Sequence, residues 1–361
     1  MQRSAVEVAQ PTAVDLFAGG GGLTVGLKAA GFRVVSAVEL EPHAYATYKA
    51  NHPEVFAYKQ DIRTVDGPSL ESHAKERIDL LVGCPPCQGF TSLTSKWRRD
   101  DPRNLLVREM TRLVAATLPR SVMMENVPGL AGAGSYLLHE VVDALEALGY
   151  RVTFDVLQVA HYGTPQMRRR LVLFAGHGFE IPLPKPTHGK QAGNAPLRTI
   201  QDAISGLPCP ATFSPRAVRS GLPISGWHVV RTLSPENRDR IRHAKPGGNW
   251  KDIPEHLRPP CHRGSYNGFS NVYGRMTWGE PSPTITAGCT TISKGRFAHP
   301  HEDRTISLYE AALLQEFPSD YILSTEYMER ACEIIGNALP CGFAMQMAMS
   351  VKAALDLPRV V

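Results

Sequence analysis

Apolar and polar positions alternate with two different periods along the first 180 residues. Short apolar runs predict strands at 13–17, 32–38, 78–82, 121–124, 151–159 and 171–175. Helix-like stretches between them predict helices at 23–30, 42–50, 104–117 and 137–148. This alternation predicts an α/β fold with a mainly parallel sheet and helices on both faces. Ligands bind at the carboxyl ends of the strands in such sheets, so functional residues are expected there.

The pattern changes near residue 181. The stretch 184–300 holds 15 of the 29 prolines and three of the four tryptophans, and its apolar positions show little periodicity. It is expected to form a second, smaller, loop-rich domain after a first domain at 1–183. Helical periodicity then returns at 307–315, 326–335 and 341–355, within a C-terminal part at 301–361.

Composition excludes two classes of protein. Apolar residues make up 43% of the 361 positions and charged residues 20%, which is typical of a globular chain and not of a disordered one. No run approaches the roughly 18 apolar residues that span a bilayer, and the first residues lack the apolar core of a signal peptide. The sequence therefore predicts a soluble, cytoplasmic protein. Seven scattered cysteines argue against a disulfide framework and leave a free thiol available for catalysis.

Charge is distributed unevenly. The stretch 184–300 has 16 Lys and Arg against 6 Asp and Glu, a balance of +10, whereas the rest of the chain has a balance of −5. Such a split favours a polyanion as the partner of the basic part. A solvated basic face without a partner would give the same composition, so charge alone leaves both interpretations open.

Three features at the predicted strand ends suit a ligand. Gly19 to Gly22 follow the first strand and open a helix, which lets the backbone approach a bound group beside a helix N-terminus. Thr24 breaks the dinucleotide-binding fingerprint, which requires glycine there. Glu39 ends the second strand, where a carboxylate can accept hydrogen bonds from ribose hydroxyls, and Asp61 follows the next extended stretch. Each feature alone also fits a tight turn or a solvated acid.

The segment Gly83-Cys84-Pro85-Pro86-Cys87-Gln88-Gly89 follows a buried-type strand directly. Two prolines fix the backbone before Cys87 and a glycine frees it afterwards, which presents a side chain rigidly at the mouth of a loop. The two cysteines could form a redox pair or half a zinc site, or one of them could be a nucleophile activated by nearby basic residues. A buried pair of thiols is a further interpretation.

Acidic and basic residues follow at two later strand ends. Glu125 stands where the fourth predicted strand ends, next to a Pro-Gly turn. If 166–170 is extended, Arg168 and Arg170 point one way and Arg169 the other, so that two guanidinium groups could meet an anion or a carbonyl oxygen. A salt-bridged loop acid and a solvated basic turn are the alternatives.

Taken in order, these segments resemble the motifs of the bacterial-type DNA (cytosine-5)-methyltransferases. The matching segments are Asp15-Leu16-Phe17-Ala18-Gly19-Gly20-Gly21-Gly22, Pro86-Cys87-Gln88, Glu125-Asn126-Val127, Gln166-x-Arg168-x-Arg170 and Gly336-Asn337-Ala338. A further stretch from Arg304 to Pro318 is similar to the family's penultimate motif but departs at Tyr309 and Leu313, where arginines are usual. The resemblance reaches from residue 15 to about 340, and it implies a Rossmann-like methyltransferase fold whose C-terminal helices return to the catalytic domain.

The resemblance also implies a reaction. The Cys87 thiolate would attack carbon 6 of a cytosine, while Glu125 bonds the ring and supplies a proton. Arg170, with Arg168 nearby, would hold the carbonyl oxygen or a phosphate. Carbon 5 would take the methyl group of S-adenosylmethionine, which leaves as S-adenosylhomocysteine. Because a base inside a duplex is out of reach, it would be flipped out.

Two residue sets follow from the resemblance, and no metal is expected. Residues expected to bind the cofactor are Phe17, Ala18, Gly19, Gly20, Gly22, Glu39, Leu40, Asp61, Ile62, Pro86, Leu106, Asn337 and Ala338. Residues expected to contact DNA are Gln88, Thr91, Ser92, Arg99, Arg103, Gln166, Arg275 and Thr284. The basic stretch 184–300 would be the target-recognition domain, which neutralises phosphates and reads base edges.

Double-stranded DNA is thus the predicted substrate of a sequence-specific methyltransferase. An RNA cytosine-5 methyltransferase of similar fold is the alternative enzyme, and a catalytically silent DNA-binding protein is an alternative of another class. A nicotinamide dehydrogenase is disfavoured by Thr24. The resemblance further suggests a monomer in the bacterial cytoplasm and nucleoid, and raises a cognate restriction endonuclease as a partner.

Overall fold

The computed structural model describes residues 10–74, 77–86, 88–90, 101–214, 218–264 and 269–357, without the side chain of residue 88. Four predicted site residues therefore lie outside the described residues, together with the side chain of Gln88. They are Cys87, Thr91, Ser92 and Arg99.

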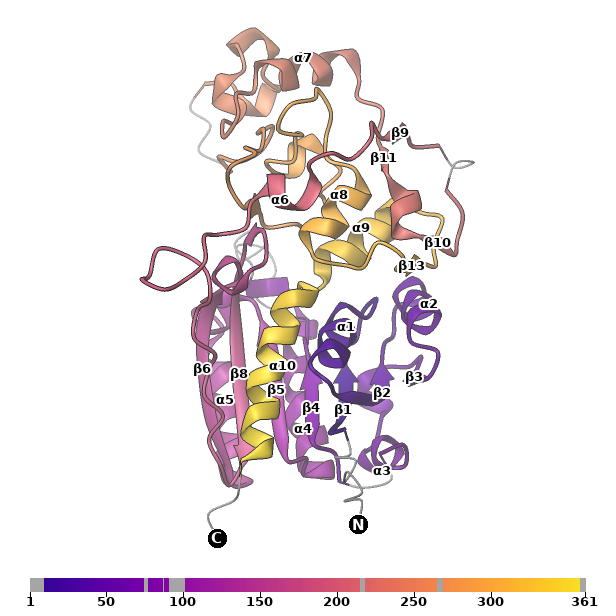
Figure 1. The fold of residues 1–361 in the computed structure, drawn as a ribbon, viewed down its shortest axis with the longest axis vertical. Coiled ribbons are helices and arrows are strands. Elements are labelled where there is room, and N and C mark those ends of the chain that lie inside the picture. Colours follow the sequence, from indigo (N-terminus) through magenta and orange to yellow (C-terminus); the bar gives the residue numbers. More distant parts are fainter. Residues whose placement is uncertain are drawn as a thin grey trace, which may run out of the picture.

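A seven-stranded sheet forms the lower half of the molecule in Figure 1. Its strands are β1 (Thr12–Leu16), β2 (Arg33–Val38), β3 (Phe56–Tyr58), β4 (Leu80–Gly83), β5 (Ser121–Asn126), β6 (Tyr150–Gln158) and β8 (Arg169–His177). The order across the sheet is β3-β2-β1-β4-β5-β8-β6, and β8 runs antiparallel to both of its neighbours while the other pairs are parallel. The predicted mixed, mainly parallel α/β fold is confirmed.

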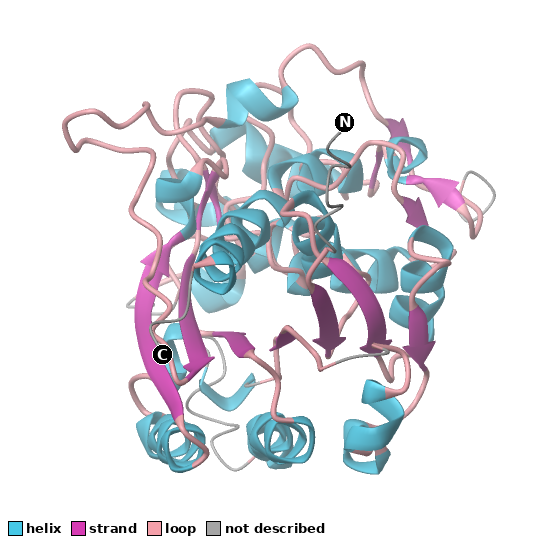
Figure 2. Ribbon diagram, turned by 60° about the horizontal axis from the view of Figure 1, so that its bottom comes forward, coloured by secondary structure: helices cyan, strands magenta, loops and turns pink. Residues whose placement is uncertain are grey.

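Helices cover both faces of this sheet, as Figure 2 shows. Side chains alternate along the central strand β4, so that Leu80 and Val82 pack on one face and Leu81 on the other. The first face is covered by α1 and α10 and the second by α3, α4 and α5, while α2 lies beside α1. The bounds are α1 (Gly22–Ala29), α2 (Pro42–Asn51), α3 (Gly67–Glu71), α4 (Val107–Thr117), α5 (Ser135–Ala147) and α10 (Cys341–Asp356).

Capping residues determine where several helices begin. Glu41 accepts a hydrogen bond from the Ala44 backbone at the start of α2, and Ser234 does the same for Asn237 at the start of α7 (Pro235–His243). Pro42 and Pro235 occupy the first helical position, where the missing N–H has no partner to lose.

The helix α10 lies along the sheet face, close against α1 (Figure 1). A Cβ added at Gly26 of α1 would lie 2.5 Å from the Cβ of Ala344, so the two helices approach at a glycine. The segment Met328–Asp356 is long and apolar enough to cross a bilayer, but 61% of its apolar window is buried inside the protein and it divides into two helices at Pro340. Packing in the core accounts for its apolar character.

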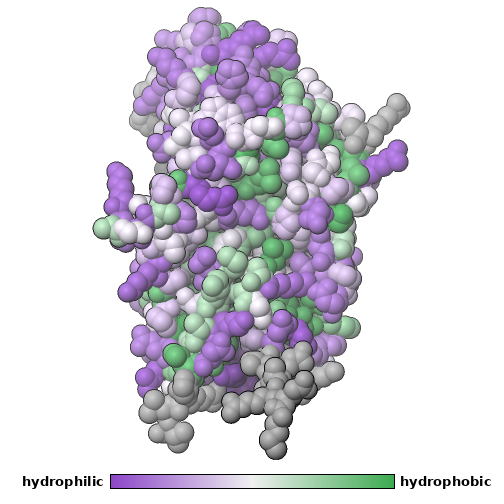
Figure 3. Space-filling view, viewed as in Figure 1, coloured by the Kyte–Doolittle hydropathy of each residue, from purple (hydrophilic) through white to green (hydrophobic). Residues whose placement is uncertain are grey.

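The region after residue 181 is rich in loops. Its regular elements are short: α6 (Ile200–Ile204), α7, β9 (Ala211–Thr212), β10 (Leu222–Pro223), β11 (Val229–Val230) and β12 (Ser282–Pro283). Its core surrounds the fully buried Trp227. A smaller apolar cluster that includes Ile241 and Trp250 supports α7 at the far end of the molecule. The surface over that end is mostly hydrophilic in Figure 3.

The C-terminal part contains α8 (Leu308–Leu314) and α9 (Met328–Asn337) before α10. Both pack with the core around Trp227, together with β13 (Ile322–Leu323), whereas α10 alone reaches the sheet. Tyr309, which departs from the family motif, packs edge-on against the ring of His228, whose Nδ1 lies 2.8 Å from Ser307 Oγ. The departure is thus accommodated by an aromatic contact.

Candidate active site

The glycine turn begins where β1 ends. Phe17, Gly19 and Gly21 have φ angles of 58°, 56° and 94°, in the left-handed region where a non-glycine residue such as Phe17 is strained. Both carboxylate oxygens of Glu39 accept backbone hydrogen bonds, from Gly19 at 2.7 Å and from Glu41 at 2.7 Å. Burial raises the pKa of Glu39 above its ordinary value. Glu39 therefore ties the turn to the end of β2.

The glycines at 20 and 21 are required by the protein itself. A Cβ at Gly21 would lie 2.5 Å from the hydroxyl of Tyr321 and 2.6 Å from Nε2 of His52, and one at Gly20 would lie 2.4 Å from Ile334. A Cβ at Gly19 would meet no described atom within 4 Å. The sequence assigned Gly19, Gly20 and Gly22 to the cofactor, and of these three only Gly19 has free space around the position of a Cβ.

Asp15 lies beneath the turn and is fully buried. Thr24 donates a hydrogen bond to its Oδ2 at 2.7 Å, while Oδ1 has no partner among the described residues. Burial raises the pKa of Asp15 from 3.8 to about 7. The site therefore holds a carboxyl group that is protonated more easily than an ordinary one.

The other predicted cofactor residues surround the carboxyl ends of the same strands. Asp61 follows β3 and caps the turn Ile62–Thr64, and its carboxylate is held by the Arg63 side chain at 2.5 Å, a contact that lowers the Asp61 pKa to about 2. Leu40 is 57% exposed, whereas Ile62 is buried and Leu106 packs beside the same core. Asn337 ends α9 as an exposed residue, and Ala338 lies 3.3 Å from the position of a Cβ on Gly22. The folded chain thus brings Ala338 to the glycine turn.

Glu125 and Arg170 meet at the neighbouring strand ends. Nε of Arg170 lies 2.6 Å from Oε1 of Glu125, and both side chains are mostly buried. The carboxamide of Asn126 donates to the carbonyl of Pro85 at 3.0 Å, which fastens the Pro-Pro segment to β5. This arrangement joins the predicted catalytic acid, its arginine and the loop that leads to Cys87.

Cys84 occupies the same corner, since Gly83 pairs with Met124 in adjacent parallel strands. Burial, and after it the carboxylate of Glu125, raises the pKa of the Cys84 thiol well above its ordinary value. Of the two cysteines, Cys84 is therefore held as a neutral thiol, which is the wrong state for a nucleophile.

Arg168 does not share the position of Arg170. It is buried, and its Nη1 donates to the carbonyls of Ile285 at 2.8 Å and Gly336 at 3.3 Å. Gln166 is also buried and binds Gln315 at 2.8 Å and the backbone N–H of Ile285 at 3.0 Å. These two residues fasten the 282–287 segment, which pairs with β7 (Gln166–Met167), to the sheet domain.

Close packing against the 282–287 segment explains why residue 336 is a glycine. A Cβ there would lie 2.2 Å from backbone atoms of Thr286 and Ala287. Thr284 donates to the carbonyl of Met167 at 2.9 Å, so its hydroxyl also has a partner within the protein. The sequence assigned Gln166 to DNA and Arg168 to the reacting base or a phosphate, and in the structure these two side chains, together with Gly336, hold three chain segments together.

Comparison with known proteins shows the family to which this chain belongs. Residues 12–353 match the family described as C-5 cytosine-specific DNA methylase. The chain belongs to this family. It is 38% identical over 349 residues to the type II methylase M.HgiDII of Herpetosiphon aurantiacus, with 95% of each chain covered. It is 35% identical to the type II methyltransferase M1.HphI of Haemophilus parahaemolyticus, over 94% of this chain and 86% of that protein.

Solved structures agree on the fold. A candidate DNA modification methyltransferase encoded within an E. coli prophage superposes with a TM-score of 0.72 at 21% identity, covering 96% of this chain and 100% of that one. The protein is accordingly a DNA cytosine-5 methyltransferase by family membership, and the family resemblance stated from its motifs is confirmed.

Arg103, which is expected to contact DNA in this methyltransferase, has a charged partner within the protein. Arg103 is half-exposed, and its guanidinium pairs with Asp101 at 2.7 Å. Asn104, next to it, accepts a hydrogen bond from the Gly89 backbone at 3.2 Å, which links residue 89 to the turn that precedes α4.

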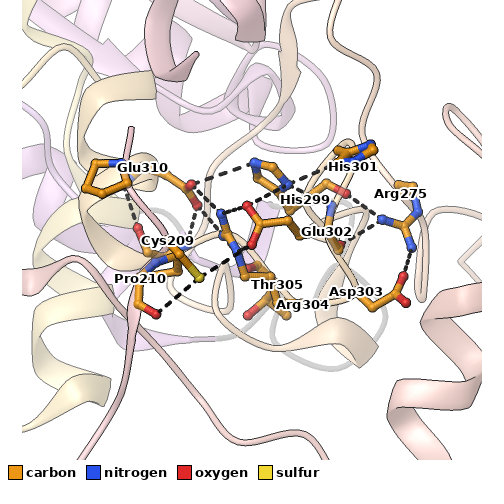
Figure 4. Close-up of polar contacts among 12 residues, drawn as sticks. Cys209, Pro210, Arg275, His299, His301, Glu302, Asp303, Arg304, Thr305 and Glu310 are labelled. Atoms are coloured by element: carbon orange, nitrogen blue, oxygen red, sulfur yellow. Dashed lines mark hydrogen bonds and ion pairs between the residues drawn. The ribbon is translucent and has the colours of Figure 1, made fainter. Parts of the chain in front are cut away.

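Arg275 requires a correction. Its guanidinium is buried and donates to the carbonyls of Ala244, Ile241, His299 and Glu302 and to the carboxylate of Asp303, at 2.7–2.9 Å. Figure 4 shows Arg275 beside His299, Glu302 and Asp303. All three nitrogens are occupied within the protein, so this side chain has no donor left for a base edge. Arg275 instead ties the end of α7 to the 299–303 segment.

Proposed function

We propose that this protein transfers a methyl group from S-adenosylmethionine to carbon 5 of a flipped-out cytosine at a specific short sequence in duplex DNA. The observation that carries the proposal is the Glu125–Arg170 pair, which stands at the carboxyl edge of the sheet beside the Pro85–Pro86 segment. An acid and a cation placed together there suit the ring of a pyrimidine, which presents both an amine and a carbonyl oxygen.

The glycine turn and the acids around it fit the proposed cofactor. Gly19 leaves open space above the turn, and Glu39 at the end of β2 and Asp61 after β3 suit hydroxyl and amino groups. When bound, S-adenosylmethionine supplies the methyl group that carbon 5 receives. Phe17, Glu39 and Ala338 would hold it at the open side of the turn.

The chain's own residues would carry the rest of the chemistry. Cys87, outside the described residues, would form the bond to carbon 6, since burial and Glu125 keep Cys84 a neutral thiol. After carbon 5 has taken the methyl group, loss of the carbon-5 proton and release of the Cys87 thiolate from carbon 6 would restore the ring double bond. Glu125 would hydrogen-bond the ring nitrogen and supply the proton that this nitrogen receives. Arg170 would keep the carboxyl group of Glu125 in place and bind the carbonyl oxygen of the ring. Arg168 would act by holding the 282–287 segment in place.

Duplex DNA is the proposed substrate because the stretch 184–300 carries a balance of +10. The relatives M.HgiDII and M1.HphI are named as type II enzymes, which supports a partnership with a restriction endonuclease acting on the same site. A monomer working in the cytoplasm on nucleoid DNA completes the proposal.

Methylation of a long mixed-sequence duplex tests this function. The purified protein is incubated with S-adenosylmethionine, and 5-methylcytosine is mapped by bisulfite sequencing, with Cys87→Ser as control. We expect methylation at one recurring short sequence that is lost in Cys87→Ser. If wild-type protein that binds S-adenosylmethionine leaves this DNA unmodified, the proposal fails, and the same assay on structured RNA then separates an RNA enzyme from a silent binder.

A further inference from the structure

A chain of polar side chains runs beneath the glycine turn and connects it to a segment 300 residues later. Nζ of Lys28 lies 2.8 Å from Nδ1 of His52, and Nε2 of His52 lies 3.2 Å from the hydroxyl of Tyr321. The Tyr321 hydroxyl in turn contacts the carbonyl of Gly20. His52 and Tyr321 are buried, and Glu54 forms an ion pair with Lys28 at the outer end of the chain.

The direction of each hydrogen bond in this chain is determined. An ammonium group only donates, so Nδ1 of His52 must accept from Lys28 and the ring carries its hydrogen on Nε2. Burial, and then the charge of Lys28, lowers the pKa of His52 to about 4, which keeps the ring neutral near pH 7. His52 therefore donates its Nε2–H to the oxygen of the Tyr321 hydroxyl, and Tyr321 donates its single hydroxyl hydrogen to the Gly20 carbonyl.

Tyr321 is itself held firmly against α2. The side-chain amide of Asn51 donates to the carbonyl of Ile322 at 2.8 Å and accepts from its N–H at 2.8 Å. Ser324 donates its N–H to Thr47 at 3.0 Å. The Tyr321 hydroxyl is thus placed by contacts that do not involve the glycine turn, and it can impose a conformation on the turn.

We propose that Tyr321 is a positioning residue for the cofactor, which holds the Gly19–Gly22 turn in its binding conformation through the Gly20 carbonyl. This inference rests on the proposed binding of S-adenosylmethionine at that turn. Gly20 and Gly21 have no room for a side chain because Ile334, Tyr321 and His52 lie directly below them. Without the hydroxyl, the Gly20 carbonyl would lose its partner, and the ligand would have to order the turn itself.

The test is Tyr321→Phe, which removes the hydroxyl and keeps the ring. We expect its Kd for S-adenosylmethionine, measured by isothermal titration calorimetry, to rise about tenfold, which equals about 1.4 kcal/mol. The KM for DNA and kcat at saturating S-adenosylmethionine should stay at wild-type values. The matched control is Tyr162→Phe, because the buried Tyr162 hydroxyl donates to the carbonyl of Pro184 at 3.0 Å, away from the turn. Its Kd should not change.

Two substitutions of His52 extend the test. Gln carries an N–H near the position of Nε2, so His52→Gln should bind S-adenosylmethionine almost as the wild type does, whereas His52→Leu should reproduce the weaker binding of Tyr321→Phe. Wild-type affinity in Tyr321→Phe would overturn the inference, and so would an equal loss in Tyr162→Phe. Failure of the wild-type protein to bind S-adenosylmethionine would instead overturn the proposed function.

Discussion

The Arg170 guanidinium lies 2.6 Å from the Glu125 carboxylate, although 44 residues separate the two along the chain. The pair forms because β8 runs antiparallel to β5, so that the first residues of β8 meet the last residues of β5. A mostly buried cation beside the acid fixes the orientation of the carboxyl group that is proposed to bond the base. The sheet therefore positions Glu125 and Arg170 together.

Replacement of Glu125 should separate catalysis from cofactor binding. We expect Glu125→Gln to lower kcat for methylation by on the order of 100-fold or more, since the amide can hydrogen-bond a base but cannot supply a proton. The Kd for S-adenosylmethionine should remain within about twofold, because Glu125 lies away from the glycine turn. Methyl-transfer kinetics and calorimetry measure the two quantities. Near-wild-type kcat would show that Glu125 does not act as the proton donor.

Substitutions of the neighbouring Arg168 and Arg169 should affect the free energy of unfolding very differently. Arg168 is buried and holds the carbonyls of Ile285 and Gly336, whereas Arg169 is exposed. Arg168→Met should lower the free energy of unfolding by roughly 2–4 kcal/mol, because the carbonyls lose a charged donor. Arg169→Met should change it by less than about 0.5 kcal/mol. Urea unfolding compares them, and equal effects would contradict a structural role for Arg168.

Substitution of Arg275 should lower the stability of the protein and leave the methylated DNA sequence unchanged. Lysine cannot satisfy the five acceptors that surround the Arg275 guanidinium, so Arg275→Lys should lower the free energy of unfolding by roughly 2–3 kcal/mol. Arg242→Lys, at an exposed position of α7, should be nearly neutral. Bisulfite mapping should find the same methylated sequence in both variants. An altered recognition sequence in an otherwise stable Arg275→Lys protein would restore its role in reading bases.

Asp15 should make stability depend on pH. The folded protein raises the pKa of Asp15 from 3.8 to about 7, so between these values the folded state keeps a proton that the unfolded chain releases. The contribution of Asp15 is therefore complete below about pH 4 and is lost as the pH rises to 7. Relative to wild type, Asp15→Asn should gain stability by a few kcal/mol between pH 4.5 and 8. Urea unfolding at both pH values checks this, and a constant difference would refute it.

Glu316 combines backbone strain with a buried carboxylate. Its φ is 61°, and its side chain accepts hydrogen bonds from Thr164 at 2.7 Å and Arg198 at 2.8 Å. Glu316→Ala should be destabilising because the strain remains and the contacts are lost. Glu316→Gly should be about 1 kcal/mol more stable than Glu316→Ala, since glycine adopts this φ freely. Thermal unfolding of the two variants measures the difference, which should vanish if the left-handed conformation is not strained.

Local patterns predicted the sheet well, because strand and helix periods depend on neighbouring residues alone. The expected runs at 32–38 and 121–124 became β2 and β5, and Glu39 and Glu125 stand at their carboxyl ends as predicted. The reason is physical, since parallel strands place their ends at one edge. The loop-rich stretch after 181 has no such period. Charged residues are usually exposed, so nothing in the sequence indicated that Arg275 in this stretch is buried.

The sequence by itself determined the α/β framework, the order of the motifs and the family, since these depend on residue type and spacing. Only the tertiary structure decided which motif residues contact one another. Gln166, Arg168 and Gly336 hold segments together, whereas the mostly buried Glu125 and Arg170 pair where β5 ends and β8 begins. Tyr321 reached the Gly20 carbonyl only through folding, because contacts across 301 positions depend on how whole layers pack and leave no periodic signal in the chain.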